Sequence, residues 1–480
     1  MNNKLIKSKN QVKVEDLSLK VLSKEQISKN AEIISKQLHA YTWRDLETNG
    51  KFCKNDKISI LTEDTLIVGC DIGSESHYIR AIDSRGIELS KNAYCFNNNE
   101  EGFGKAKEWI LKLAAQHDKK QVVLGLEPTG HYWFAIAMWM ISNGISVVQV
   151  NPYAVKQSKE IEDNSQKKDD KKDPKVIANL VKDGNYGVPY IPDGIYAELR
   201  NLSGFREQLV EDRIRAVNRL HREMTVYFPE YKDAFGKIDG TFAIEVLKTA
   251  PLPEDIVKLE EKGLCAIWHE AKLRGRGYSR AKKIVDYAKS SIGLKEGTYG
   301  AREKIKWCIS QIIVFDEKIR ETEEKIHEYC WKLPFVDNIL EIKGIGEVTL
   351  AGIISEMGDI SRFDDVREIQ KLSGLNLVDC SSGKHKGQTK ISYRGRKRLR
   401  YWLFQAAKSA VAHGYEYKLL HKYYTIREDN PLKKMQSLIV IACKILRVIF
   451  SMLTKGTKYD PEKMLGDIKR PCSKVAQTVA

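Results

Sequence analysis

Four carboxylates in this chain stand where strands end or helices begin. Asp71 falls inside the apolar run IVGCDIGS, and Glu127 ends a second apolar run in LGLEPTGHYW. Asp170 and Asp173 are three residues apart, so on a helix they would share one side. A buried carboxylate is costly unless it binds something. Mg²⁺ prefers oxygen ligands, so these residues predict a site for one or two such ions that activates phosphoryl transfer on nucleic acid.

The same residues leave other assignments open. Asp173 stands before Pro174 and therefore also suits the N-cap of a helix. Asp163 and Asp169 are alternative ligands in the same stretch of acids and lysines. The string IVGCDIGSESHY is also similar to the phosphate loop of actin-like sugar and acetate kinases. Such kinases need a second glycine-rich loop and an adenosine site, and the sequence contains neither.

One stretch near the C-terminus is densely basic. The chain has 80 Lys and Arg against 64 Asp and Glu, a net charge of +16 that favours a polyanion such as DNA or RNA. Eight of the cations lie between Lys384 and Arg400, in a stretch without a carboxylate. Six of these are predicted to contact phosphates: Lys384, Lys386, Lys390, Arg394, Arg396 and Arg400.

A glycine-rich turn precedes this basic stretch. Gly344 and Gly346 flank Ile345 between two apolar segments that are typical of helices. We expect a helix-hairpin-helix motif whose backbone amides face a DNA phosphate, although the same turn can simply link two helices.

The hydropathy pattern predicts the elements that position the carboxylates. Apolar runs predict a three-stranded antiparallel meander, followed by alternating helices and strands. The expected strands cover 66–72, 78–83, 87–96, 121–127 and 145–150, and the expected helices cover 101–116 and 131–143. This order is typical of a mixed α/β sheet covered by helices. If the first and fourth strands are neighbours, Asp71 and Glu127 emerge at one site.

The chain after residue 150 reads differently. The polar stretch 157–172 predicts a loop, and a helix is expected from Asp173. Residues 199–228 have helical spacing, and residues 305–329 repeat apolar residues in alternating steps of three and four. The second pattern predicts a coiled coil or a long helical hairpin, and a helix packed on its own domain also fits. Residues 230–300 have no clear assignment.

The remaining composition bears on cellular context. Nine cysteines are scattered without metal-binding spacing, which favours reduced thiols in a cytoplasm. We expect no signal peptide, because the first residues lack an apolar core. The apolar stretch 437–453 contains Lys444 and Arg447, so it predicts a buried or partner-facing helix and no membrane span.

The order of these motifs resembles the DEDD class of insertion-sequence transposases, a family of bridge-RNA-guided recombinases. The family's first Asp falls on Asp71 in GCDIGSESHY, and its Glu falls on Glu127 in LEPTGHYW. The strand ending in VNPYAVKQS is similar to the family's Asn-Pro-x-x-Val-Lys. The family's Lys-Thr-Asp-x-x-Asp-Ala reads KDDKKDP here, which matches Asp170 and Asp173 and leaves Asp169 as a competitor.

The resemblance implies a three-part architecture. It implies a RuvC-like, ribonuclease-H-like α/β domain, a helical or coiled-coil middle, and a small, mainly helical transposase domain. The corresponding ranges are a polar extension over 1–62, the RuvC-like domain over 63–190, the helical domain over 191–332, the transposase domain over 333–455 and a polar tail over 456–480.

The resemblance also assigns a nucleophile. In the family, a serine directly before a glycine forms a covalent phosphoserine link with DNA. Ser382 before Gly383 is the match, and Ser381 stands beside it. From the residues alone, this string reads as a simple turn.

Together these points predict a DNA transposase that uses a Mg²⁺-bound acidic centre and a serine nucleophile. The resemblance further implies DNA partners at the element ends and the target, a guide RNA, and a dimer or tetramer of this chain. The alternatives are a Mg²⁺-dependent junction nuclease that acts with water, and a nucleic-acid-binding protein without catalysis.

Overall fold

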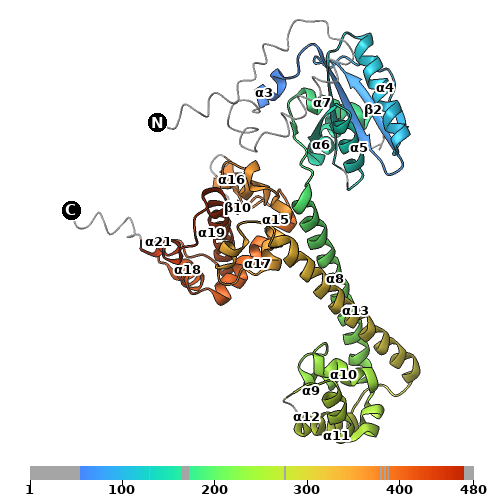
Figure 1. Ribbon diagram of the computed structural model, residues 1–480, viewed down its shortest axis with the longest axis vertical. Coiled ribbons are helices and arrows are strands. Elements are labelled where there is room, and N and C mark those ends of the chain that lie inside the picture. The colour runs from blue at the N-terminus through green and yellow to red at the C-terminus, as the bar shows by residue number, and fades with distance from the viewer. Residues whose placement is uncertain are drawn as a thin grey trace, which may run out of the picture. The chain divides into compact units, whose positions relative to one another are not determined.

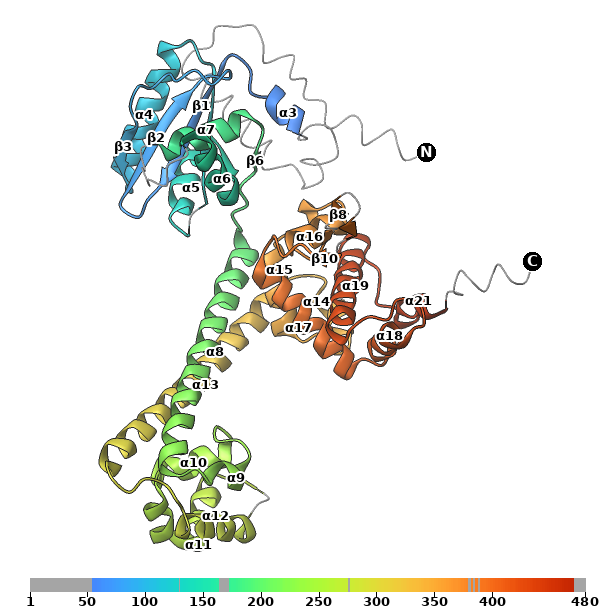
Figure 2. The ribbon, with the colours of Figure 1, turned by 180° about the vertical axis from the view of Figure 1, so that it is seen from behind.

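The computed structural model describes residues 54–128, 130–163, 172–274, 277–378, 381–382, 385–386 and 389–469. The chain divides into two compact units, each described here by itself. The first comprises Met1–Ile191 with Asp359–Leu372, and the second comprises Pro192–Gly358 with Ser373–Ala480. The first unit is mixed α/β and the second is almost wholly helical (Figures 1 and 2).

The first unit is built on a six-stranded sheet with the order β3-β2-β1-β4-β5-β6. Strands β4 and β5 run parallel to β1, whereas β2, β3 and β6 are antiparallel to their neighbours. The strands are β1 (Thr65–Ile72), β2 (Ser76–Ile82), β3 (Tyr94–Asn97), β4 (Gln121–Leu126), β5 (Ser146–Val150) and β6 (Tyr186–Gly187). The parallel pairing of β1 with β4 confirms that the first and fourth strands are neighbours.

Helices cover both faces of this sheet. α4 (Glu100–Gln116) and α5 (Trp133–Ser142) close one apolar core, which includes Val68 and Leu124. α6 (Pro152–Asp163) and α7 (Asp173–Lys182) close the other, which includes Ile67 and Val123. Because strand side chains alternate between faces, β1 and β4 read as continuous apolar runs that feed both cores.

Two predictions for this unit need correction. The expected third strand over 87–96 is short, because only Tyr94–Asn97 pair with β2, while Glu88 makes an isolated bridge to Ile82. The expected loop over 157–172 is wrong in its first part, because α6 continues to Asp163. A short helix, α3 (Lys54–Ser59), precedes the sheet, inside the expected polar extension.

The second unit contains a long antiparallel helical hairpin. α8 (Gly194–Tyr227) pairs with α13 (Thr298–Cys330), and Arg206–Glu323 and Arg213–Asp316 ion pairs cross between them. The repeat predicted at 305–329 forms its seam, since Ile305, Ile312 and Ile326 are fully buried or nearly so. Of the predicted alternatives, the long helical hairpin therefore describes this region, and both of its helices belong to the same chain.

Four helices form a subdomain between the two arms of the hairpin, over the range that had no sequence assignment. They are α9 (Tyr231–Phe235), α10 (Thr241–Thr249), α11 (Pro253–Glu270) and α12 (Tyr278–Lys289). Their core also takes residues from both arms, such as Met224 and Ala301.

The C-terminal part is also mainly helical. It comprises α14 (Val336–Leu340), α15 (Glu347–Met357), η2 (Ile360–Arg362), α16 (Val366–Leu372), α17 (Lys397–His413), α18 (Tyr415–Ile426), α19 (Lys434–Lys455), α20 (Pro461–Met464) and α21 (Gly466–Lys469), with short strands β7 (Leu377–Val378), β8 (Ser381–Ser382), β9 (His385–Lys386) and β10 (Lys390–Ile391). Among the described residues, α19 alone is long and apolar enough to cross a membrane. Its apolar face packs against α17 and α18, and Ile441, Ile445 and Ile449 are fully buried there.

Candidate carboxylate site

Asp71 and Glu127 lie side by side at one end of the sheet. The parallel register pairs Cys70 with Leu126, and Asp71 and Glu127 are the next residues along the two strands. Both are half-buried, and both take part in polar interactions. Burial, reinforced by the charge of Asp71, raises the pKa of the Cys70 thiol well above its usual range. The sheet thus brings two of the four predicted carboxylates to neighbouring positions.

A pair of glycines brings the start of α7 to this end of the sheet. Gly69 pairs with Gly125 across β1 and β4, two residues before Asp71 and Glu127. A Cβ atom on Gly69 would lie 1.8 Å from the Pro174 carbonyl oxygen, and one on Gly125 would lie 2.4 Å from Val181 Cγ2. Strand residues two apart share a face, so Asp71 lies on the α7 face with Gly69. The missing side chains allow the first turn of α7, which begins at Asp173, to approach Asp71.

Asp173 is a buried carboxylate with a cationic partner. Its side chain accepts a hydrogen bond in an ion pair from Lys159 of α6. The predicted N-cap role is wrong, because α7 begins at Asp173 itself and Lys172 occupies the cap position. Asp173 therefore contributes a charged side chain in the first turn, next to the Asp71 strand.

Other contacts tie the first turn of α7 to the sheet. Lys175 Nζ lies 2.6 Å from Glu88 Oε1, and Arg80 of β2 pairs with the same carboxylate. The hydrogen bond from Lys175 holds the pKa of Glu88 below its usual value, with a further contribution from the charge of Arg80. Glu88 thereby links α7 to β2, and this fixes the position of Asp173 along the sheet.

Two of the remaining predicted acids, Asp169 and Asp170, lie outside the described residues. The third, Asp163, is the last residue of α6. In the part of the chain that the structure describes, no three His, Cys, Asp or Glu side chains lie close enough together to hold a metal ion. The carboxylates fit Mg²⁺ by their oxygen donors and by their convergence at one sheet end.

The predicted nucleophile belongs to a small strand pair. Ser381 and Ser382 form β8, which pairs antiparallel with β9, and Ser382 stands opposite His385. Only two residues, 383 and 384, separate this strand from β9, so the expected turn at this string stays a prediction. Gly383 and Lys384 lie outside the described residues. Lys386 belongs to β9, and Lys390 is exposed in β10.

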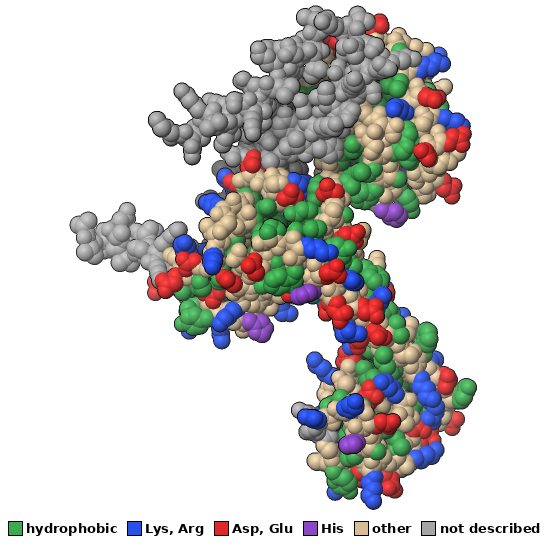
Figure 3. All heavy atoms as spheres, in the orientation of Figure 1, with side chains coloured by type: hydrophobic (Ala, Val, Ile, Leu, Met, Phe, Trp, Pro, Cys, Tyr) green, Lys and Arg blue, Asp and Glu red, His purple; other side chains and the backbone are tan. Residues whose placement is uncertain are grey.

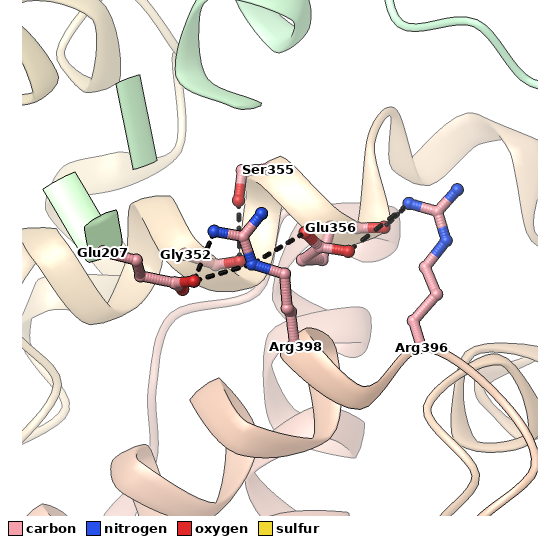
Figure 4. A network of polar contacts seen from close by, with 6 residues as sticks. All are labelled: Glu207, Gly352, Ser355, Glu356, Arg396 and Arg398. Atoms are coloured by element: carbon pink, nitrogen blue, oxygen red, sulfur yellow. Dashed lines mark hydrogen bonds and ion pairs between the residues drawn. The ribbon is translucent and has the colours of Figure 1, made fainter. Parts of the chain in front are cut away.

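Two of the predicted phosphate-binding arginines make contacts within their own domain. Arg396 Nη1 donates to the Glu356 carbonyl oxygen at 2.8 Å and lies 3.6 Å from its carboxylate (Figure 4). Arg398 bridges the same buried Glu356 to Glu207 of α8. Arg400 Nη1 donates to the carbonyl oxygen of Ser373 at 2.9 Å. Arg394 is exposed and also takes part in an interaction. These arginines thus help to hold the domain together.

The Gly344–Gly346 turn packs closely against α17. Gly344 has φ +95°, and a Cβ there would lie 2.7 Å from the Ala410 backbone. Gly346 is exposed and precedes α15, whose first residue, Glu347, pairs with His327 at 2.7 Å. Close packing therefore explains the glycine at position 344. The start of α15, where a phosphate was expected, carries the acidic side chain of Glu347.

Sequence reasoning missed Lys159. The stretch around it was expected to be a loop, although Val155 and Lys159 are four residues apart and so share one face of α6. Val155 is 1% exposed. Recognising that face would have placed Lys159 toward α7.

Comparison with known proteins covers most of the chain. Residues 68–229 match a transposase family of the DEDD, IS110 type, and residues 336–424 match the family described as transposase IS116/IS110/IS902. An insertion element IS116 protein of 44.8 kDa from Streptomyces clavuligerus is 23% identical, over 83% of this chain and 97% of the relative. A pilin gene-inverting protein of Moraxella bovis is 22% identical, over 78% of this chain and 97% of the relative. The mini-circle putative transposase for IS117 of Streptomyces coelicolor is 24% identical, over 67% and 79% respectively. The matched ranges include Asp71, Glu127, Asp173 and Ser382, and the chain belongs to the IS110-type DEDD transposases.

Proposed function

We propose that this chain cuts and rejoins DNA strands as a transposase, with a metal-binding carboxylate centre and a serine nucleophile. The observation that carries the proposal is the adjacency of Asp71 and Glu127 at the ends of β1 and β4, beside the start of α7. The names of relatives, transposases and a gene-inverting protein, support DNA as the substrate.

The strand order supports a ribonuclease-H-like, RuvC-type fold for the first unit. An antiparallel β1-β2-β3 meander followed by β4 and β5 parallel to β1 is the arrangement that this reading requires. In that reading, the first strand supplies Asp71 and the fourth supplies Glu127.

Asp71, Glu127, Asp170 and Asp173 would hold one or two Mg²⁺ ions. A bound ion would polarise the scissile phosphate and favour ionisation of the attacking hydroxyl. The protein would hold the carboxylates in position for the ion. Gly69 and Gly125 let α7 approach the sheet, and the Glu88–Lys175 pair fixes α7, so Asp71 and Asp173 stay close.

Ser382 is the proposed nucleophile. Its Oγ attacks the phosphorus, the bond from phosphorus to the leaving strand breaks, and that strand's oxygen takes up a proton. The serine proton is lost to a base or to solvent. The phosphoserine link keeps the phosphate bond energy until the second strand's hydroxyl attacks. Lys390 and the neighbouring basic residues would place the strands without reading their sequence.

Sequence choice and assembly complete the proposal. A guide RNA would select the DNA by base pairing, and copies of this chain would assemble through the helical middle as a dimer or tetramer. The carboxylates and Ser382 belong to different compact units. One active site could therefore take its two parts from two copies.

The test is to trap the covalent intermediate. Full-length protein, its element-end DNA and Mg²⁺ are incubated, denatured and resolved for a protein–DNA adduct, with wild type, Asp71→Asn and Ser382→Ala compared. Wild type should form the adduct, and both variants should lose it while binding DNA as before. Metal-dependent cleavage without any adduct would instead identify a nuclease that acts with water. No metal-dependent cleavage at all would indicate a binding protein.

A further inference from the structure

The α9–α12 subdomain has no assigned role. The family matches end at residue 229 and resume at residue 336, so the whole subdomain lies between them. Its helices nevertheless form a well-buried core, in which Tyr231, Leu247 and Ile284 are fully buried. No residue of the carboxylate site lies in this subdomain.

A cavity in this subdomain combines aromatic rings with cations. It has a volume of about 330 Å³ and is lined by Phe235, Lys237, Gly240, Thr241, Phe242, Ala243 and Arg280. The Arg280 guanidinium lies 5.5 Å from the centre of the Phe235 ring and 6.0 Å from that of Phe242. Both rings are only half-buried, so they line the cavity as well as the core. Flat aromatic faces beside a guanidinium are the chemistry that stacks nucleobases.

The rings are held in place from behind. Trp268 packs edge-on against both Phe235 and Phe242, and its Nε1 donates to the Phe242 carbonyl oxygen at 3.1 Å. A platform that is fixed before binding loses little conformational entropy when a base stacks on it.

The segment around Arg280 is strongly basic and carries a third aromatic ring, that of Tyr278. The described residues between Lys272 and Lys283 include five cations and no carboxylate. Tyr278, at the start of α12, is 61% exposed. Lys282 and Lys283 are exposed beside it, and Figure 3 shows Lys and Arg side chains over this lobe, interspersed with Asp and Glu. A backbone of phosphates would be attracted here while its bases meet Tyr278 and the cavity.

We propose that the α9–α12 subdomain binds unpaired, single-stranded DNA, with one base stacked in the Phe235–Phe242–Arg280 cavity and a neighbouring base on Tyr278. The choice of DNA rests on the proposed function, because strand exchange exposes unpaired strands of the DNA substrate. Stacking on rings is tolerant of sequence, so the subdomain would hold any strand that is opened during exchange. Duplex DNA buries its base faces in its own stack and would gain only the phosphate contacts.

The test measures binding of full-length protein to fluorescent 20-nucleotide oligomers by anisotropy, in EDTA so that no cleavage occurs. The probes are single-stranded DNA, the same sequence as duplex DNA, and the same sequence as single-stranded RNA. Phe242→Leu keeps apolar bulk and removes the ring, and Arg280→Gln removes the cation over the two rings while keeping a polar side chain. Lys258→Gln is the matched control, because Lys258 is an exposed cation on α11 outside the basic segment.

We expect Phe242→Leu and Arg280→Gln each to weaken single-stranded DNA binding by about ten-fold, and duplex binding by less than about two-fold. Lys258→Gln should behave as wild type on all probes. Unchanged single-stranded binding in Arg280→Gln would overturn the proposal, as would an equal loss on duplex. A loss confined to RNA would replace DNA by RNA as the occupant. Because these assays contain no metal, they are independent of the Asp71→Asn cleavage test.

Discussion

The ammonium group of Lys159 pairs with the carboxylate of Asp173, the carboxylate in the first turn of α7. The Asp173 residue is 7% exposed, so this charge sits in a largely desolvated environment beside the β1 end. An unpaired carboxylate there would be destabilising, and Lys159 supplies the positive charge that neutralises it. A divalent ion bound by Asp173 would have to take the place of that ammonium.

Lys159→Gln should therefore tighten metal binding. Removing the competing cation should lower the dissociation constant for Mn²⁺ by about two- to five-fold, the range expected for an ion pair of modest strength. Isothermal titration of the full-length protein with Mn²⁺ measures it. Lys156→Gln on the exposed side of α6 is the charge-matched control. Equal affinities in the two variants would mean that Lys159 and the metal do not compete for Asp173.

Gly69→Ala should displace α7. The new Cβ would clash with the Pro174 carbonyl, and a backbone atom cannot rotate away. We expect a loss of about 1–3 kcal/mol in the free energy of unfolding, and loss of strand cleavage. Chemical denaturation and the cleavage assay check the two effects.

Gly104→Ala serves as the control for that substitution. Gly104 lies within α4, where a Cβ meets nothing within 4 Å. Alanine there should stabilise the protein by about 0.5–1 kcal/mol and leave cleavage unchanged. Normal cleavage by Gly69→Ala would show that the position of α7 is unimportant for the reaction.

Arg396→Gln and Lys390→Gln should separate structural from DNA-binding cations. Arg396 holds the buried Glu356, so its loss should destabilise the domain by about 1–3 kcal/mol. Lys390 is exposed in β10, so its loss should change stability by less than about 0.5 kcal/mol. Losing Lys390 should instead weaken DNA binding equally at every sequence. The slope of log binding constant against log salt concentration should fall by about one. Thermal unfolding and salt-dependent binding together decide the assignment, and the reverse pattern would reject it.

Ser381 and Ser382 should differ sharply. The family resemblance assigns the nucleophile to the serine directly before a glycine, and Ser382 stands before Gly383. Ser382→Ala should abolish the covalent adduct and Ser381→Ala should retain it. If Ser381→Ala alone loses the adduct, the nucleophile is Ser381; if both single variants and the double variant retain it, covalent serine chemistry is ruled out.

The strands and most of the helices around the carboxylates are predictable from the sequence, because β1, β4 and β5 bury both faces and appear as unbroken apolar runs. The predicted third strand is longer than β3, because the composition of residues 87–96 favours β-structure but does not determine which of them pair with β2. α6 was missed because its polar residues outnumber the few, such as Val155, that mark its buried face. The positions of Asp71 and Glu127 followed from strand ends. The contact of Lys159 with Asp173 could not, because it depends on how α6 and α7 pack.

The α9–α12 subdomain also has a consequence for how this chain can vary. Its two ends meet where the Leu294 amide donates to the Val226 carbonyl oxygen at 2.9 Å, and Gly293 fits against the Tyr227 backbone. The point where the chain leaves α8 thus lies next to the point where it returns toward α13. The segment between these points could be exchanged or enlarged without changing the register of the hairpin, provided that arm residues in the shared core, such as Met224 and Ala301, stay covered. Recombinases built on this plan could therefore acquire or lose a strand-handling module in one evolutionary step.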